Sequence, residues 1–132
     1  MKNNFKFGAT SLTKKINLFG NEFTVISESQ QKDKSNTLYV YAEVIDGVTY
    51  LKFGEAFSQT VWQRYDATGD TQHAKIIKVW KSSVHDKPIH KVLKKNFTWA
   101  GKKYQNPLTT NEAYIMNSLN EVNNFIGTID NI

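Results

Sequence analysis

The sequence contains no cysteine, which excludes disulfide bonds and thiolate metal sites and is compatible with an intracellular protein. No apolar run approaches the roughly 18 residues of a transmembrane helix, and no apolar segment typical of a signal peptide follows the first residue. With 132 residues, the chain has the length of one ordinary domain. We therefore expect a soluble cytoplasmic protein that makes no membrane contact.

Acidic residues are fewer than basic residues, 12 against 17, which leaves a formal net charge of +5. This balance favours an anionic partner, and nucleic acid is the commonest one. The lysines are dispersed along the chain and form no basic tail, so the charge supports a nucleic-acid partner without deciding it. A hydrophobic fraction of 39% is sufficient for a folded core.

The first 37 residues have the composition of an accessory segment. Residues 16–19 and 23–26 are suited to a short hairpin around Gly20-Asn21. Residues 27–37 are polar, charged and free of large apolar side chains, which is typical of a linker. We therefore distinguish an N-terminal segment, residues 1–37, from a main domain, residues 38–132.

A β-hairpin is predicted at the start of the main domain. Residues 38–44 alternate in the manner of a strand, Asp46-Gly47 is a strong signal for a two-residue turn, and residues 48–53 form the returning strand. This turn places Tyr41 opposite Lys52 and Tyr39 opposite Gly54, and directly paired residues share a face of the sheet. One face is then aliphatic (Leu38, Val40, Ala42, Leu51, Phe53), and the other carries Tyr39, Tyr41, Glu43, Tyr50 and Lys52.

Helical spacing dominates the rest of the chain. Phe57, Val61 and Tyr65 predict a short helix over about residues 58–66, and residues 75–80 read as a third strand. A helix capped by Asp86 is expected to continue to about residue 95, and a final helix is expected over roughly residues 110–125. The order β-β-α-β-α-α predicts an α+β fold, with a small three-stranded, mainly antiparallel sheet flanked by helices.

Two positions on these elements suggest chemistry. A lysine about 5 Å from Tyr41 favours the phenolate, which could activate a water, although an exposed aromatic beside a cation is also ordinary on a half-buried sheet. Arg64, on the predicted short helix, could grip two phosphate oxygens, although a solvated helix arginine fits the same position.

Glu112 allows two interpretations. Residues 109–112 (TTNE) fit a capping box, in which the glutamate only holds a helix terminus. Glu112 also lies on the helical line of Ile115, Met116 and Leu119, which points into the protein, where an unpaired carboxylate is costly. A helix cap and a metal ligand both fit this position.

The ordered set of these positions resembles the GIY-YIG nuclease superfamily. Tyr39-Val40-Tyr41 and Lys52-Phe53-Gly54 match the two half-motifs, and an arginine and a glutamate follow at suitable places. The resemblance covers roughly residues 38–126. It implies that Tyr41 acts in proton transfer, that Gly54 is the family's glycine, that Arg64 binds the phosphate and that Glu112 binds Mg²⁺ or Mn²⁺.

The sequence departs from the parent pattern, because Lys52 replaces a tyrosine and Leu38-Tyr39 stands where a glycine is common. The lysine is similar to a phage-associated branch with KIG-type motifs, which tends to carry a histidine in a helix before the glutamate. His90 matches that histidine, although a histidine at the edge of the core fits as well. Whether Lys52 assists catalysis or only binds phosphate stays open.

The resemblance implies a metal-dependent endonuclease that cuts double-stranded DNA, with catalytic groups from Tyr41, Lys52, Arg64, His90 and Glu112. The tyrosine-rich face, with Tyr39, Tyr50 and Gly54, is expected to contact the substrate backbone. Members of the family are often fused to further domains. Two alternatives remain at this point: a non-catalytic nucleic-acid-binding module on the same scaffold, and a protein-interaction domain that does not bind DNA.

Overall fold

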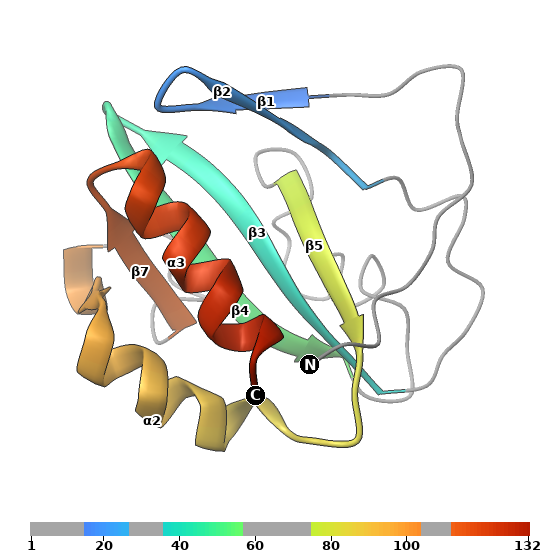
Figure 1. The fold of residues 1–132 in the computed structure, drawn as a ribbon. Coiled ribbons are helices and arrows are strands. Elements are labelled where there is room, and N and C mark those ends of the chain that lie inside the picture. Colours follow the sequence, from blue (N-terminus) through green and yellow to red (C-terminus); the bar gives the residue numbers. More distant parts are fainter. Residues whose placement is uncertain (1–14, 27–35, 57–74, 104–111) are drawn as a thin grey trace.

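The computed structural model describes residues 15–26, 36–56, 75–103 and 112–132 (Figure 1). Their strands are β1 Lys15–Leu18, β2 Asn21–Thr24, β3 Thr37–Ile45, β4 Val48–Ala56, β5 Lys75–Lys81, β6 Thr98–Trp99 and β7 Ala113–Met116. Their helices are α2 Asp86–Asn96 and α3 Leu119–Asp130, with a short 3-10 helix, η2 Gly101–Lys103. The helix predicted over residues 58–66, with Arg64, lies outside the described residues.

The main sheet has five strands in the order β5-β3-β4-β7-β6, and each neighbouring pair is antiparallel. The α+β class is confirmed, but the prediction of three strands is wrong. Two of the strands were missed: β6 has only two residues, and β7 lies where a helix was predicted.

The predicted hairpin is confirmed in its register. Ile45 pairs with Val48, so Tyr41 lies opposite Lys52 and Tyr39 opposite Gly54. The turn residues Asp46 and Gly47 have φ angles of 50° and 78°, the left-handed region that makes Asp-Gly a favoured hairpin turn.

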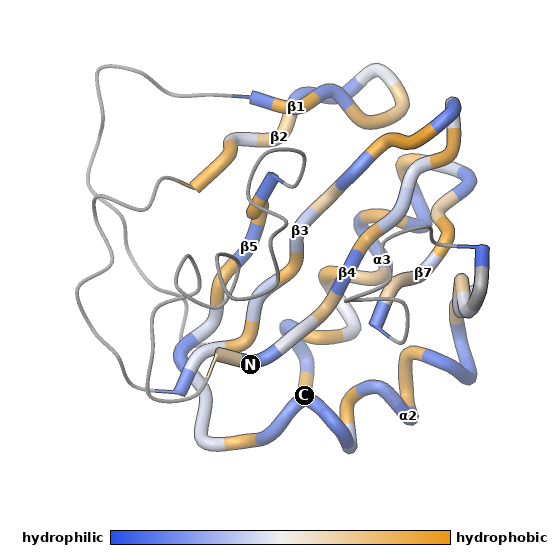
Figure 2. The backbone as a smooth tube through the Cα atoms, turned by 180° about the vertical axis from the view of Figure 1, so that it is seen from behind, coloured by the Kyte–Doolittle hydropathy of each residue, from blue (hydrophilic) through white to orange (hydrophobic). Residues whose placement is uncertain are grey.

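Both helices pack on one face of the main sheet, as the opposite views of Figures 1 and 2 show. The predicted aliphatic face of the hairpin meets them there, and Figure 2 shows α2 with both hydrophilic and hydrophobic residues, as an amphipathic helix requires. The core cluster on this face comprises Leu38, Val40, Ala42, Leu51, Phe53, Ile77, Trp80, Ile89, Leu93, Tyr114, Met116, Val122, Phe125 and Ile129, together with Leu18.

The tyrosine-rich face is also buried. Tyr39 is 1% exposed, Tyr41 0%, Tyr50 6% and Lys52 1%. The three tyrosines pack with Ile76, Val79, Ala100 and Ala113 in a second cluster. The expectation that this face contacts a DNA backbone from the protein surface is therefore wrong for the structure as it stands. Alternation along a strand predicts two faces but does not predict whether the second face meets solvent.

The final helix begins later than predicted. Residues 113–116 pair with β4 as strand β7, and α3 starts only after Ser118, whose Oγ accepts the Glu121 N–H at 3.1 Å. The Glu121 carboxylate in turn accepts the Asn117 N–H at 2.9 Å, so the capping residues are Ser118 and Glu121. Glu112 therefore does not open a helix but directly precedes strand β7.

The hairpin β1–β2 packs on the same protein body as the main sheet. Leu18 is 1% exposed within the core cluster, and the Ile26 N–H donates to the Ile76 carbonyl at 2.8 Å. Its turn is Phe19-Gly20, one residue earlier than predicted. In the part of the chain that the structure describes, no helix is long and apolar enough to cross a membrane.

Candidate functional site

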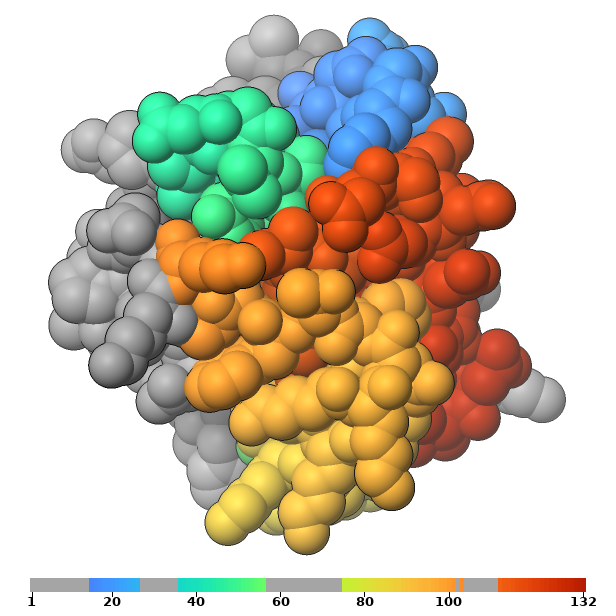
Figure 3. Space-filling view, turned by 90° about the vertical axis from the view of Figure 1, so that its left-hand side faces the viewer, coloured from blue at the N-terminus to red at the C-terminus, as the bar shows by residue number. Residues whose placement is uncertain are grey.

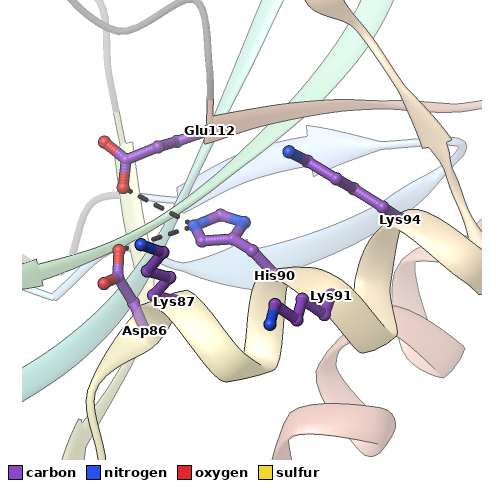
Figure 4. Close-up of a pocket in the computed structure, with 6 residues that line it drawn as sticks. All are labelled: Asp86, Lys87, His90, Lys91, Lys94 and Glu112. Atoms are coloured by element: carbon purple, nitrogen blue, oxygen red, sulfur yellow. Dashed lines mark ion pairs between the residues drawn. The ribbon is translucent and has the colours of Figure 1, made fainter.

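Asp86, His90 and Glu112 form a cluster where the first turns of α2 approach the beginning of β7 (Figure 4). Asp86 and His90 are four residues apart on α2, a spacing that puts both side chains on one side of the helix. The β4–β7 register pairs Lys52 with Ala113, so Glu112, the preceding residue, is brought beside Lys52.

Glu112 lies between two cationic groups. Its Oε2 is 3.6 Å from His90 Nε2, and its Oε1 is 3.9 Å from Lys52 Nζ. His90 Nε2 is also 3.5 Å from Asp86 Oδ2. These distances are those of ion pairs and are too long for good hydrogen bonds. Within the described ranges, the buried Nε2 accordingly has no hydrogen-bond partner.

The other ring nitrogen of His90 is firmly held. His90 Nδ1 lies 2.7 Å from Tyr114 Oη, whose own proton is directed to the His90 carbonyl at 3.5 Å. The network therefore assigns the Nδ1–H as donor and Tyr114 Oη as acceptor. The Tyr114 ring stacks on the His90 ring with 5.8 Å between centroids, and the Phe53 ring contacts the His90 ring edge-on, with 5.2 Å between centroids. These contacts point Nε2 toward the two carboxylates.

The charges of the cluster depend on one another. Burial would lower the pKa of His90, but the carboxylates of Asp86 and Glu112 outweigh burial and raise that pKa above its ordinary value of 6.5. Burial would raise the pKa of Glu112, but the cationic groups of His90 and Lys52 outweigh it and hold that pKa below 4.5. Burial, reinforced by the two carboxylates, raises the pKa of Tyr114, which keeps its hydroxyl protonated. Without a metal, the cluster thus favours an imidazolium between two carboxylates.

Lys52 connects this cluster to the tyrosines. Its ammonium is buried, 5.3 Å from the centroid of the Tyr41 ring and 5.6 Å from that of the Tyr39 ring. Tyr41 is the residue paired with Lys52, as predicted, but the Lys52 ammonium donates to Tyr39 Oη, at 3.4 Å. The sequence register therefore identifies the right strand position without identifying this hydrogen bond.

Gly54 has a steric role in this arrangement. A Cβ atom at Gly54 would lie 2.6 Å from Tyr39 Oη and 2.8 Å from Tyr39 Cζ, well inside van der Waals contact. The Tyr39 ring therefore crosses over Gly54, and only glycine leaves room for it. Its place in the second half-motif is explained by the packing of Tyr39, with no need for direct substrate contact.

The structure brings together most of the predicted site residues. Those that meet around Lys52 and Glu112 are Tyr39, Tyr41, Lys52, His90 and Glu112. Tyr50 shares their face of the sheet, but its hydroxyl donates to the Lys103 carbonyl at 3.3 Å. Arg64 lies outside the described residues.

Sequence reasoning missed one residue of the cluster, Asp86, and the residue that holds its histidine, Tyr114. Asp86 was interpreted as a helix cap, but the N-cap is His85, and Asp86 reaches His90 instead. The i,i+4 spacing of Asp86 and His90 was the signal that could have identified the pair. No comparable signal points to Tyr114, because its contact with His90 depends on the register of β7.

The donor atoms fit a divalent cation. One ligand atom each from Asp86, His90 and Glu112 can be chosen so that all three lie within 4.8 Å of one another. A ligating histidine usually donates its second ring N–H to another group, as His90 does to Tyr114. Two carboxylates and one imidazole suit Mn²⁺ and related ions well, and Mg²⁺ through the carboxylates.

Comparisons with protein-family models, with curated proteins and with solved structures found no match for this chain.

Proposed function

We propose that this chain is a GIY-YIG-type endonuclease that hydrolyses phosphodiester bonds of DNA with the help of a divalent metal ion. One observation carries the proposal. Tyr41, Lys52, His90 and Glu112 come from different elements and form one chain of contacts: the Lys52 ammonium lies 5.3 Å from the centroid of the Tyr41 ring and 3.9 Å from Glu112 Oε1, and His90 Nε2 lies 3.6 Å from Glu112 Oε2. Buried charged groups gathered in this way are characteristic of functional sites.

Asp86, His90 and Glu112 are the residues that would hold the ion, Mg²⁺ or Mn²⁺. Bound there, the ion would supply Lewis-acid stabilisation of the leaving 3′-oxygen. The protein's part is to fix the three ligands, and the Tyr114 hydroxyl and the Phe53 ring do this for His90.

Lys52 provides a fixed positive charge beside two phenols. The phenol of Tyr41 lies beside this ammonium, an arrangement that supports a role for Tyr41 in taking a proton from the attacking water. Tyr39 is the direct hydrogen-bond partner of Lys52, so it is a second candidate for the same role. Both side chains are buried, so this role requires that water enter between them and the residues that cover this face of the sheet.

The test is cleavage of supercoiled plasmid at low salt, with Mg²⁺ or Mn²⁺, by wild type and by the variants Glu112→Ala, Tyr41→Phe and Tyr39→Phe. Glu22→Ala is the matched control, because Glu22 is an exposed β2 residue that forms an ion pair with Lys15, at 3.5 Å, away from the cluster. We expect nicking by wild type and by Glu22→Ala that stops with EDTA and in Glu112→Ala. Loss of nicking in one of the tyrosine variants identifies the hydroxyl that transfers the proton.

Two outcomes would contradict the proposal. Cleavage that survives Glu112→Ala would mean that the metal lies elsewhere. DNA binding without cleavage under either metal would favour a non-catalytic binding module on the same scaffold.

A further inference from the structure

A pocket of ≈ 340 Å³ lies along one flank of α2. It is lined by Asp86, Lys87, His90, Lys91, Lys94 and Glu112, and is therefore continuous with the Asp86–His90–Glu112 cluster. Three of these six residues are lysines, at positions 87, 91 and 94, which follow one side of the helix. They span about 10 Å along its axis at 1.5 Å per residue.

These lysines are exposed and lie close to one another on the helix. The α2 sequence contains four lysines and one acidic residue, Asp86. Among the residues that the structure describes, Lys87, Lys91 and Lys94 form no ion pair. Lysines four residues apart on a helix repel one another. Lys87 also lies in the first turn, where a positive charge opposes the helix dipole. The helix dipole favours Lys94, which lies in the last turn, but helix stability does not explain Lys87 and Lys91, whereas an anionic ligand would.

Figure 4 shows Lys87 and Lys94 on either side of His90, so cations flank the proposed metal cluster in both directions. At one end of the row, Lys94 Nζ lies 4.7 Å from the centroid of the Trp99 ring, which is 43% exposed. The cation–π contact holds the Lys94 ammonium near the pocket. Lys87, Lys91 and Lys94 are all exposed, and Figure 3 shows α2, in gold, on the outside of the molecule.

The tyrosine-rich face of the main sheet is buried and offers no surface to a DNA backbone. We propose that Lys87, Lys91 and Lys94 bind the phosphates of double-stranded DNA that adjoin the scissile phosphate, with the strand running along α2. This inference rests on the proposed function for the position of the scissile phosphate, but not for the binding itself. Phosphates repeat along a strand, and a row of lysines beside a metal-binding cluster matches that repetition.

The test measures, by fluorescence anisotropy, the binding of a short labelled DNA duplex in EDTA at several salt concentrations. EDTA removes cleavage from the measurement. The logarithm of the association constant decreases linearly with the logarithm of the salt concentration, by roughly 0.9 per phosphate contact. For the triple variant Lys87→Gln/Lys91→Gln/Lys94→Gln, we expect this slope to be less steep by about 2 to 3. Glutamine keeps the helix propensity of lysine, so the fold is expected to persist, and circular dichroism checks this.

The matched pair is Lys94→Gln against Lys95→Gln. The two lysines are neighbours on α2 and the charge change is the same, but only Lys94 lines the pocket. We expect Lys94→Gln to lower the slope by about 1 and Lys95→Gln to change it clearly less. DNA should also change the fluorescence of Trp99, and Trp99→Phe should remove that component.

An equal loss in Lys94→Gln and Lys95→Gln would overturn the inference in favour of diffuse charge, and unchanged binding by the triple variant would place the DNA elsewhere. Absence of DNA binding by wild type at low salt would overturn it as well. If wild type binds through this row but never cleaves, the inference stands and the proposed nuclease function fails.

Discussion

Removing the carboxylate of Glu112 should destabilise the metal-free protein more than removing the ammonium of Lys52. The Lys52 side chain is 1% exposed and its Nζ lies 3.9 Å from Glu112 Oε1, whose side chain is 26% exposed. At an effective dielectric constant of about 20, the attraction at this distance is about 4 kcal/mol, and partial exposure of Glu112 reduces it. The cost of burying an ammonium is several kcal/mol and offsets this attraction.

The two single variants therefore differ. In Lys52→Met the desolvation cost of the ammonium disappears together with its attraction to Glu112. We therefore expect the free energy of unfolding to change by no more than about 1 kcal/mol. In Glu112→Gln the buried ammonium keeps its desolvation cost and loses its carboxylate, so we expect a loss of about 2 to 3 kcal/mol. Urea denaturation in EDTA measures the free energy of unfolding of both variants, and the double variant completes a double-mutant cycle.

The expected coupling free energy is about 2 kcal/mol, with the double variant more stable than Glu112→Gln alone. A Lys52→Met variant that loses at least as much stability as Glu112→Gln would refute this reasoning. So would a coupling close to zero, because the 3.9 Å pair would then contribute nothing.

Three further predictions concern the packing and the charges of the fold. Gly54→Ala should lower the free energy of unfolding by about 1 to 3 kcal/mol, because its Cβ would overlap the Tyr39 ring; a neutral result in urea denaturation would contradict the packing described. Ser118→Ala should cost about 1 kcal/mol, because Ser118 Oγ caps α3, and an unchanged denaturation midpoint would show that the cap is dispensable. The third concerns pH in EDTA. The raised pKa of His90 gives stability that is complete below pH 6.5 and lost as the pH rises through that pKa. The lowered pKa of Glu112 gives stability that is complete above pH 4.5 and lost as the pH falls through that pKa. The stability difference between wild type and His90→Asn should therefore be largest between about pH 4.5 and 6.5 and shrink at alkaline pH, and a difference that grows with pH would contradict the assignment.

The sequence predicts the centre of the fold well. Asp46-Gly47 determines the turn, and the turn determines every pair between β3 and β4, including Tyr41 with Lys52. The apolar spacing of Ile89 and Leu93 likewise predicts α2. These elements depend on local signals that no distant contact overrides.

The other end of the chain shows where local signals fail. The apolar residues 113–116 fit a helix or a strand equally well, and hydrogen bonds to β4 decide for the strand. The sequence of residues 109–112 fits a capping box, but the observed box is formed by Ser118 and Glu121, nine residues further along the chain than Thr109 and Glu112. Glu112 is placed beside Lys52 and His90 by this long-range pairing, although its sequence interpretation assumed a helix.

The candidate site was predicted in part. The resemblance selected Tyr41, Lys52, His90 and Glu112, which the structure gathers, but Asp86 was interpreted as a cap. The burial of the tyrosine-rich face was also missed, because strand alternation does not say what covers each face. Contacts such as Lys52 with Tyr39 depend on side-chain direction, which a sequence pattern does not specify.

The central claim is that Asp86, His90 and Glu112 form a divalent metal site. Its most direct test is titration of the DNA-free protein with Mn²⁺, with free Mn²⁺ measured by electron paramagnetic resonance. We predict one bound Mn²⁺ per wild-type chain, unchanged binding in the distant control Glu22→Gln, and affinity weakened by more than about tenfold in Glu112→Gln. No bound Mn²⁺ at millimolar concentration, or equal affinity in Glu112→Gln and Glu22→Gln, would contradict the claim.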